Sequence, residues 1–248
     1  MPATDIDDED IKLESAYDSK EVLTSGNGEI DKKMGGGIPA GSLTLVEGAN
    51  NTGKSVITQQ LLWGGLQQGF SFDTYTTENT IKSFVKQMDS LSLDISDYFI
   101  FGKLHVYPVQ LNESMLSGGI SLLDCIIADI LKKNAEIILI DSLTVFMADL
   151  PEDAVLGFFA TCKKICDQGK TIIITAHTFA FGEELLTRVR SLCDAHIIVK
   201  KEEMGDRLLR TMEVSKIRGA MRATGNIVAF EVEPSLGLRI IPVSKVQL

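Results

Sequence analysis

Eight consecutive residues have the types and spacing that hold the phosphates of a nucleotide. They read Gly48-Ala49-Asn50-Asn51-Thr52-Gly53-Lys54-Ser55 and fit the pattern G-x-x-x-x-G-K-[ST]. The glycines let backbone N–H groups turn toward an anion, and the start of the following helix, which includes Val56, adds partial positive charge. Lys54 would reach the outer phosphates, and the Ser55 hydroxyl would ligate magnesium. We therefore expect residues 48–56 to bind a nucleoside triphosphate with Mg²⁺. The alternative is a glycine-rich turn without a ligand.

Two acidic residues could complete this site. Asp141 closes the apolar run EIILID and is the candidate for a second magnesium-site residue, acting on the ion directly or through water. Glu78 follows the run at 72–76 by two residues and could orient or deprotonate an attacking water. Each has a plainer alternative, because Asp141 could cap a helix at the strand exit and Glu78 could complement the dipole of the next helix.

An alternation of strands and helices would bring these residues to one edge of a sheet. Apolar runs predict strands at 42–47, 72–76, 103–107, 136–141, 171–175 and 195–199, and helical spacing predicts helices at 53–69, 79–90, 121–133, 151–169 and 183–190. Such alternation is typical of a parallel sheet with helices on both faces. Beyond Lys200, runs at 208–216, 227–231 and 238–241 follow turns at 205–206 and at Gly237 without a helix, which predicts antiparallel strands.

The fold class we expect is therefore α/β, a P-loop domain with a mostly parallel central sheet and antiparallel strands at its C-terminal edge. We place this single domain at residues 25–248. Residues 1–24 carry eight acids and few apolar anchors, so we expect an acidic, flexible lead-in. The four cysteines show no CxxC spacing and are expected to be buried, reduced thiols.

Composition narrows the class of protein. The 248 residues are 44% hydrophobic and 23% charged, values that exclude a disordered, collagenous or coiled-coil chain. No apolar run reaches the roughly 18 residues of a membrane span, and the acidic N-terminus is unlike a signal peptide, so we expect a cytoplasmic protein. The formal net charge of −10 disfavours DNA as a partner, because phosphate contacts depend on Lys and Arg.

Several segments resemble a known family. KMGGGIPAGS at 33–42, GANNTGKS at 48–55 and VSKIRG at 214–219 together resemble the RecA superfamily and, within it, the KaiC-like proteins. Within that group, the segments GGGIPAGSLTLVEG, YTTEN, ILIDSLT and TAH resemble the FlaH family, the ATP-binding accessory proteins of the archaellum, the archaeal flagellum. The resemblance runs from about residue 25 to residue 242 and implies a RecA-like fold with ATP and Mg²⁺ as ligands.

The resemblance also implies roles for four residues. Glu78 holds the place of the water-activating acid, but KaiC proteins have two acids there and this chain has Glu78-Asn79, which puts fast hydrolysis in doubt. Lys216 and Arg218 match basic residues that reach the nucleotide of the next subunit in a ring, where a cation stabilises the transferring phosphoryl group. From the residues alone, both could belong to a solvated edge strand. His177 matches a position that senses the γ-phosphate, or it is an ordinary loop histidine.

The function implied is that of a regulatory or assembly component of the archaellum motor. Mg-ATP binding, with weak or no hydrolysis, would control a homo-oligomer, expected as a hexameric ring. That ring would dock onto the motor ATPase, the membrane platform protein and other motor-complex subunits, and would lie at the cytoplasmic face of the membrane through these partners. The alternatives from other classes are a KaiC- or RecA-like ATPase acting on DNA and an autophosphorylating signalling protein.

Overall fold

The computed structural model describes residues 20–109, 122–147, 150–204, 207–221, 227–233 and 237–241. Its strands are β1 (Val22–Leu23), β2 (Ile38–Pro39), β3 (Leu43–Gly48), β4 (Phe72–Thr76), β5 (Leu104–Pro108), β6 (Ile137–Asp141), β7 (Thr171–His177), β8 (Ala195–Met204), β9 (Arg207–Ile217), β10 (Ile227–Glu233) and β11 (Gly237–Ile241). Its helices are α2 (Gly28–Lys33), α3 (Lys54–Gln67), α4 (Ile81–Ser90), α5 (Ser96–Ile100), α7 (Leu122–Lys132), α8 (Thr144–Met147), α9 (Glu152–Asp167), α10 (Glu183–Leu192) and the 3-10 turn η1 (Thr178–Ala180).

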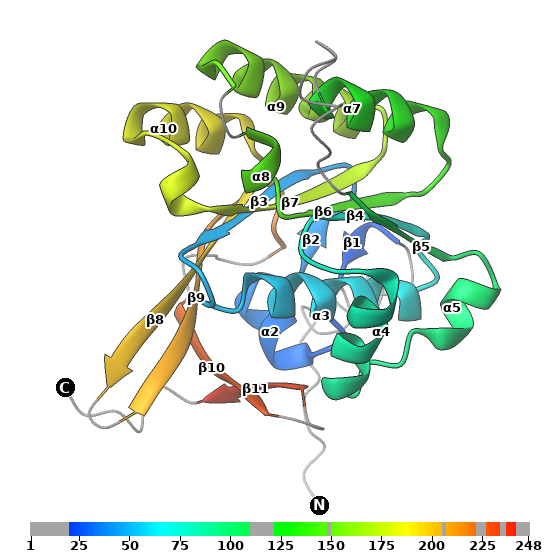
Figure 1. Ribbon diagram of the computed structural model, residues 1–248. Coiled ribbons are helices and arrows are strands. Elements are labelled where there is room, and N and C mark those ends of the chain that lie inside the picture. Colours follow the sequence, from blue (N-terminus) through cyan, green and yellow to red (C-terminus); the bar gives the residue numbers. More distant parts are fainter. Residues whose placement is uncertain are drawn as a thin grey trace, which may run out of the picture.

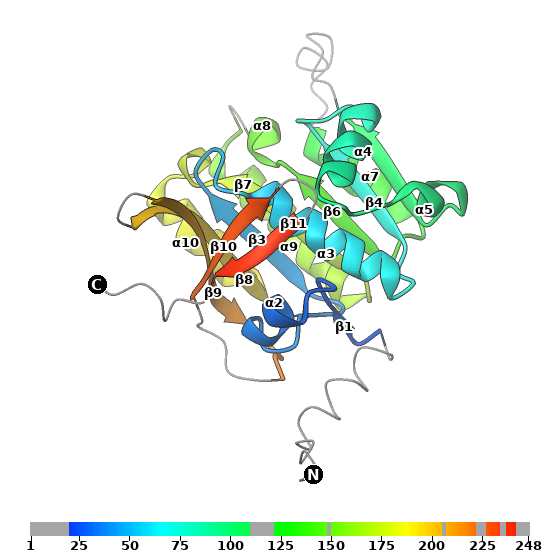
Figure 2. The same cartoon turned by 90° about the horizontal axis from the view of Figure 1, so that it is seen from below.

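One sheet organises the described residues. Its order is β11-β10-β9-β8-β3-β7-β6-β4-β5, with parallel pairing from β8 through β5 and antiparallel pairing from β8 to β11. Helices α7, α9 and α10 cover one face, and α2, α3 and α4 lie on the other (Figure 1). The antiparallel strands β10 and β11 curl beneath α2 and α3 (Figure 2). The predicted α/β class, with a parallel centre and an antiparallel C-terminal edge, is confirmed.

Each predicted strand and helix that lies in the described residues is present, with small differences at the ends. Strand β7 continues two residues further than the run TIIIT, so His177 ends a strand instead of following one. Helix α4 begins at Ile81, because the side chain of Thr80 accepts a hydrogen bond from the Ser83 N–H and caps it. The short elements β1, β2, α2, α5 and α8 were not predicted, since none is long enough to show a periodic pattern. The turn predicted at residues 205–206 lies outside the described residues.

The folded part of the chain begins earlier than the predicted boundary at residue 25. Strand β1 pairs with β2, and Val22, Leu23 and Thr24 are buried. The backbone of 24–26 also packs directly on Gly64 of α3. A two-residue strand among acidic residues gives no composition signal, so the sequence does not predict β1. Residues 1–19 of the predicted lead-in lie outside the described residues.

The close packing of residues 24–26 on Gly64 predicts how a substitution at Gly64 changes the free energy of unfolding. A Cβ added at Gly64 would lie 2.3 Å from the carbonyl carbon of Ser25 and 2.4 Å from the carbonyl oxygen of Thr24. Gly64→Ala should therefore destabilise the protein by about 1–3 kcal/mol, in spite of alanine's better helix propensity. The matched control is Gly157→Ala in α9, where no atom lies within 4 Å and a gain of roughly 0.5–1 kcal/mol is expected. Thermal unfolding of both variants measures the difference, and equal stabilisation would contradict the packing.

Candidate functional site

The loop between β3 and α3 has the backbone shape that the phosphate-binding pattern requires. Gly53 has φ of 103°, a left-handed conformation that disfavours any side chain, and it immediately precedes the first residue of α3. Gly48 is needed for another reason, since a Cβ there would lie 2.2 Å from the carbonyl oxygen of Val199 on β8. The loop thus presents the N-terminus of a 14-residue helix at the carboxyl edge of the sheet.

Lys54 places a largely desolvated cation in this loop. Its Nζ donates hydrogen bonds to the carbonyl oxygens of Gly48 at 3.2 Å and Ala49 at 2.8 Å. Burial lowers the pKa of Lys54, while the negative charges of Glu78 and Asp141 oppose that shift. A cation in low-dielectric surroundings interacts more strongly with an anion than one in water does. The arrangement is suited to a multiply charged phosphate.

Asp141 joins the P-loop to the carboxyl ends of β6 and β7. Its Oδ1 accepts hydrogen bonds from the Ser55 hydroxyl at 3.3 Å and from the Thr175 hydroxyl at 2.6 Å. Burial raises the pKa of Asp141, and the charge of Glu78 acts in the same direction against the two hydroxyls and Lys54. The hydroxyl and carboxylate oxygens are donors that suit Mg²⁺, which takes few protein ligands and keeps waters or phosphate oxygens. The residues of this site therefore fit a magnesium ion.

Among the described residues, no group of three or more His, Cys, Asp and Glu side chains could hold a metal ion by itself. Thr175 was not among the predicted site residues. Thr175 is the polar residue at the end of the apolar run TIIIT. A polar residue at the end of a strand is common, so this pattern alone does not identify a residue of the site.

A cavity of about 430 Å³ opens beside the P-loop. Its walls come from the loop and the start of α3, from the ends of β4 and β7, from α4 and from the antiparallel strands β9 and β10: Asn50, Asn51, Thr52, Gly53, Lys54, Ser55, Val56, Glu78, Gln87, His177, Arg210 and Val232. Glu78 and His177 thus lie at this cavity, as expected from the sequence. Gln87 on α4, Arg210 on β9 and Val232 on β10 were not predicted, because no local pattern in the sequence shows that these elements pack beside the P-loop.

His177 lines the cavity and also contacts two neighbouring residues, Thr144 and Phe179. The Thr144 hydroxyl accepts from the His177 backbone N–H at 2.8 Å and lies 3.0 Å from its ring Nδ1. The imidazole stacks on Phe179 with ring centroids 5.2 Å apart. Burial and the nearby charge of Lys54 lower the pKa of His177, so its neutral form is favoured at neutral pH. A neutral imidazole can either donate or accept a hydrogen bond at this position.

Lys216 and Arg218 lie far from the cavity of their own chain. Lys216 on β9 pairs with His196 near the start of β8, at the amino edge of the sheet, and Ser215 forms a bulge between the paired residues. The two side chains donate to carbonyl oxygens at the end of α10, of Arg190 at 2.9 Å and of Ser191 at 3.4 Å. Arg218 also lies 3.7 Å from Asp194, which Lys163 contacts at 2.9 Å. Arg218 follows β9 instead of belonging to it.

A buried ion pair supports the P-loop from the α10 side of the sheet. Glu47, the residue before Gly48, is 1% exposed and accepts hydrogen bonds from the Arg190 guanidinium on α10. His196 Nε2 lies 3.4 Å from the same carboxylate. Burial raises the pKa of Glu47, but His196 and Arg190 outweigh burial and leave the pKa lowered. The pair borders a second cavity of about 620 Å³. The ion pair between Glu47 and Arg190 has no signature in the sequence, because the two residues are 143 positions apart.

Known proteins resemble this chain in sequence over most of its length. The family model described as "ATPase: KaiC" matches residues 23–245. The archaeal flagellar ATP-binding protein FlaH of Sulfolobus acidocaldarius is 31% identical over 225 residues, 90% of this chain and 98% of that protein. This chain belongs to the FlaH family. A second FlaH protein, from Methanocaldococcus jannaschii, is 31% identical over 216 residues, 86% of this chain and 91% of that protein.

The fold agrees with the family. The crystal structure of the flagellar accessory protein FlaH from Methanocaldococcus jannaschii matches with a TM-score of 0.78 at 28% identity, over 90% of this chain and 99% of that one. The family match begins at residue 23, within β1, which agrees with the early start of the folded region. The resemblance inferred from the sequence motifs is confirmed. None of the helices in the described ranges has the length and apolar character to cross a bilayer.

Proposed function

We propose that this FlaH-family chain binds Mg-ATP in the P-loop cavity and acts as a nucleotide-controlled assembly component of the archaellum motor. The observation that carries the proposal is the convergence of Lys54, Ser55 and Asp141 at one edge of the sheet, with Glu78 and His177 on the same cavity. Its relatives are named as archaeal flagellar ATP-binding proteins. The names of the relatives and the geometry of the site support the same ligand.

Residues 48–56 would hold the phosphates through backbone N–H groups, with Lys54 on the outer phosphates. Ser55 and Asp141 would hold the magnesium ion, directly or through water. The part of the cavity that Gln87, Arg210 and Val232 line would receive the nucleoside. Glu78 would orient a water against the γ-phosphate, and Asn79 beside it supplies no second acid. We therefore expect ATP hydrolysis to be slow or absent, so that ATP binding, and not its hydrolysis, would control assembly.

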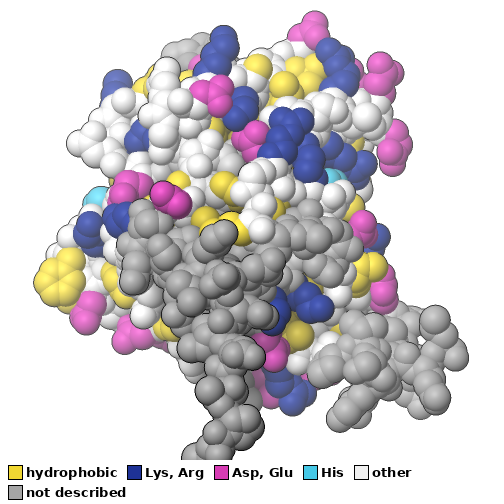
Figure 3. Space-filling view, turned by 180° about the vertical axis from the view of Figure 1, so that it is seen from behind, with side chains coloured by type: hydrophobic (Ala, Val, Ile, Leu, Met, Phe, Trp, Pro, Cys, Tyr) yellow, Lys and Arg dark blue, Asp and Glu magenta, His cyan; other side chains and the backbone are white. Residues whose placement is uncertain are grey.

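Assembly would complete the site. Lys216 and Arg218 lie at the amino edge of the sheet, whereas the cavity lies at the carboxyl edge. These two side chains would therefore contact the nucleotide of another copy and not that of their own chain. Contacts between two different faces of one chain generate a ring when the rotation closes, and we propose a hexamer. The ring would dock onto the motor ATPase and the membrane platform protein at the cytoplasmic face of the membrane. The surface seen from behind mixes Lys and Arg with Asp and Glu (Figure 3).

Single-turnover hydrolysis of Mg-ATP at high protein concentration tests the proposal. Native chain should bind ATP and turn it over slowly, and Glu78→Gln should abolish turnover while retaining binding. Lys54→Ala and Arg218→Ala should each be inactive alone. An equal mixture of these two variants should recover roughly a quarter of native turnover, because about one interface in four then joins an intact P-loop to an intact arginine.

Each arm has an outcome that counts against the proposal. Failure of the native chain to bind Mg-ATP would refute the cavity assignment. Full turnover by Arg218→Ala, or no recovery in the mixture, would refute the role of Arg218 across an interface. If native chain binds ATP and leaves it intact, the same mixtures are scored by ATP-dependent assembly measured by light scattering, with the same expected recovery.

A further inference from the structure

Arg210 brings a cation to the wall of the nucleotide cavity from the antiparallel end of the sheet. Its place follows from the strand register, because Gly48 at the end of β3 pairs with Val199 on β8, and Val199 pairs with Met212 on β9. Strand β9 runs in the opposite direction to β3, so Arg210 lies beyond the carboxyl end of β3. This position is level with the P-loop, which follows β3.

The side chain of Arg210 packs directly on the P-loop. A Cβ added at Gly53 would lie 3.2 Å from Arg210 Cδ and 3.3 Å from Phe230 Cζ, so both side chains lie against this glycine. Phe230 is fully buried and pairs with Arg210 in the ladder between β9 and β10. This packing holds the stem of Arg210 beside the residue that precedes Lys54.

The charge of Arg210 has no partner in the part of the chain that the structure describes. Although the residue is half-buried, its guanidinium forms no hydrogen bond and no ion pair there. Glu78 lies on the same cavity wall, but its charge acts on Lys54 and Asp141. Three other arginines each contact a carboxylate: Arg190 with Glu47, Arg218 with Asp194 and Arg239 with Glu231. A partly desolvated cation without a partner is suited to an anionic ligand.

The residue opposite Arg210 on β8 points to the same kind of ligand. Lys201 pairs directly with Arg210 in the ladder between β8 and β9, so two cations face each other across the strands. Like charges directly opposite each other destabilise a pair of strands. An anion bound at Arg210 would supply its missing partner and reduce this repulsion.

We propose that Arg210 binds the α- and β-phosphates of the nucleotide in the P-loop of its own chain. This inference rests on the proposed function and adds a phosphate-binding residue outside the P-loop pattern. Backbone N–H groups of a P-loop hold these two phosphates, and Arg210 packs on Gly53 of that loop. A guanidinium can donate two parallel hydrogen bonds to phosphate oxygens. The α-phosphate carries the nucleoside, so the contact agrees with a nucleoside that lies beside Arg210.

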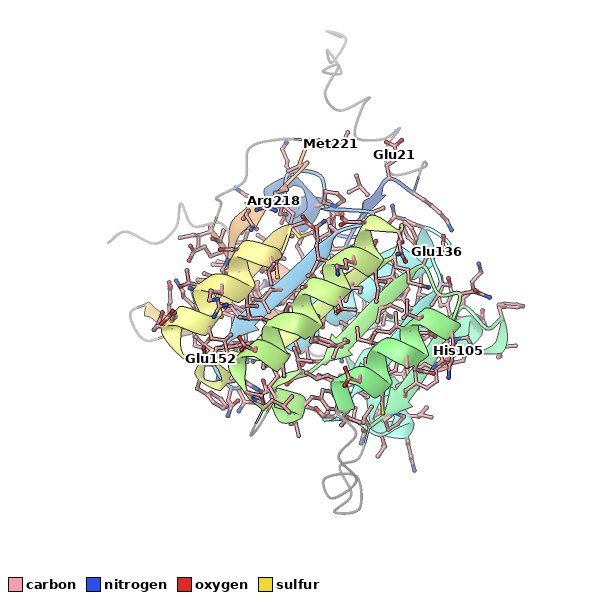
Figure 4. All side chains as sticks on the ribbon, turned by 90° about the horizontal axis from the view of Figure 1, so that it is seen from above. Glu21, His105, Glu136, Glu152, Arg218 and Met221 are labelled. Carbon is pink, nitrogen blue, oxygen red and sulfur yellow. The ribbon has the colours of Figure 1, made fainter. Side chains whose placement is uncertain are left out.

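Arg210 and Arg218 would contact different nucleotides. Arg218 follows the other end of β9 and lies on the side of the molecule away from Glu152, which begins α9 (Figure 4). We proposed above that Arg218 reaches the nucleotide of another copy, whereas Arg210 lines the cavity of its own chain. A defect at Arg210 should therefore not be repaired by a neighbouring copy.

Arg210→Met tests the phosphate contact, because it removes the charge and keeps a stem that can pack on Gly53. Affinity should fall about ten- to a hundredfold for a slowly hydrolysed Mg-ATP analogue and also for Mg-tripolyphosphate, which has no nucleoside. The matched control is Arg239→Met, which removes the same charge from an exposed ion pair on β11 and should stay within about twofold of native. Isothermal titration measures both ligands, and thermal unfolding without ligand checks the fold. If Arg210→Met does not fold, Arg210→Gln provides the same comparison.

A mixture of variants tests which copy Arg210 serves. Equal amounts of Arg210→Met and Lys54→Ala should give no sites of native affinity, because every P-loop in the mixture then lacks one of the two cations of its own chain. If Arg210 acted on the next copy, about a quarter of the sites would regain native affinity. Such a recovery would overturn the inference.

The remaining outcomes separate the inference from the proposed function. Native affinity of Arg210→Met for both ligands would overturn the inference and leave ATP binding by the P-loop intact. A loss for the ATP analogue alone, with tripolyphosphate unchanged, would place Arg210 on the nucleoside and overturn the phosphate contact. An equal loss in Arg239→Met would mean that only the overall charge of the chain matters. If native chain binds neither ligand, the proposed function itself fails.

Discussion

Replacing Lys54 with alanine should weaken Mg-ATP binding about thirtyfold to several thousandfold. Lys54 is buried at the N-terminus of α3, and its ammonium group donates hydrogen bonds to two carbonyl oxygens of the P-loop. Truncating one partner of a buried, hydrogen-bonded charge pair costs about 2–5 kcal/mol of binding. The native fold should remain, because in the described part of the chain the removed ammonium group donates its hydrogen bonds to the carbonyl oxygens of Gly48 and Ala49, which lie beside it. Isothermal titration with a slowly hydrolysed ATP analogue measures the loss.

The matched control is Lys170→Ala. Lys170 likewise donates to two backbone carbonyls, of Lys133 at 2.8 Å and Ala135 at 2.7 Å, but these lie near the amino edge of the sheet. Its removal should leave nucleotide affinity within about twofold of native, since surface substitutions away from a site have small effects. Equal losses in the two variants would mean that Lys54 acts only through loop structure, and the phosphate-binding role would then be withdrawn.

Replacing Arg190 with alanine should destabilise the native state by about 3–5 kcal/mol. The substitution leaves the carboxylate of Glu47 buried without its guanidinium partner, and removing one member of a buried pair carries this cost. For a chain of this size the melting temperature should fall by roughly 6–20 °C. Thermal unfolding followed by circular dichroism measures the change. Arg188→Ala on the same helix is the control, because Arg188 is exposed and its loss should cost less than about 0.5 kcal/mol.

The pH dependence of this effect has a definite sign. The pKa of Glu47 is lowered in the folded state, so the pairing stabilises the native state above the unfolded pKa of about 4.3 and is lost as pH falls through the folded value. The gap in melting temperature between native chain and Arg190→Ala should therefore be largest near pH 7 and should shrink below about pH 4. Adding Glu47→Gln to Arg190→Ala should recover part of the stability at pH 7. A gap that does not change with pH would exclude the ion pair as its cause.

Local signals predicted the parallel part of the fold and the centre of the site. The P-loop lies where a strand and a helix must meet, and its glycines and Lys54 follow from one short pattern. Asp141 and Glu78 could be placed because Asp141 ends one strand and Glu78 follows another, and parallel strands end at the same edge of a sheet. Each of these inferences needs only a few neighbouring residues. The same reasoning failed for β1, where two residues carry too little pattern to mark a strand.

The alternation of strands and helices, the phosphate loop and the acids at the strand ends can be predicted from the amino-acid sequence, because they depend on local periodicity and on fixed spacing. Contacts between distant residues depend instead on the packing of the folded chain. This packing brought Arg210 and Val232 to the nucleotide cavity, paired Glu47 with Arg190, and placed Lys216 and Arg218 at the edge opposite the P-loop. The order of strands in the sheet and the curl of its antiparallel end bring these residues together, and these features arise from packing between segments far apart in the chain.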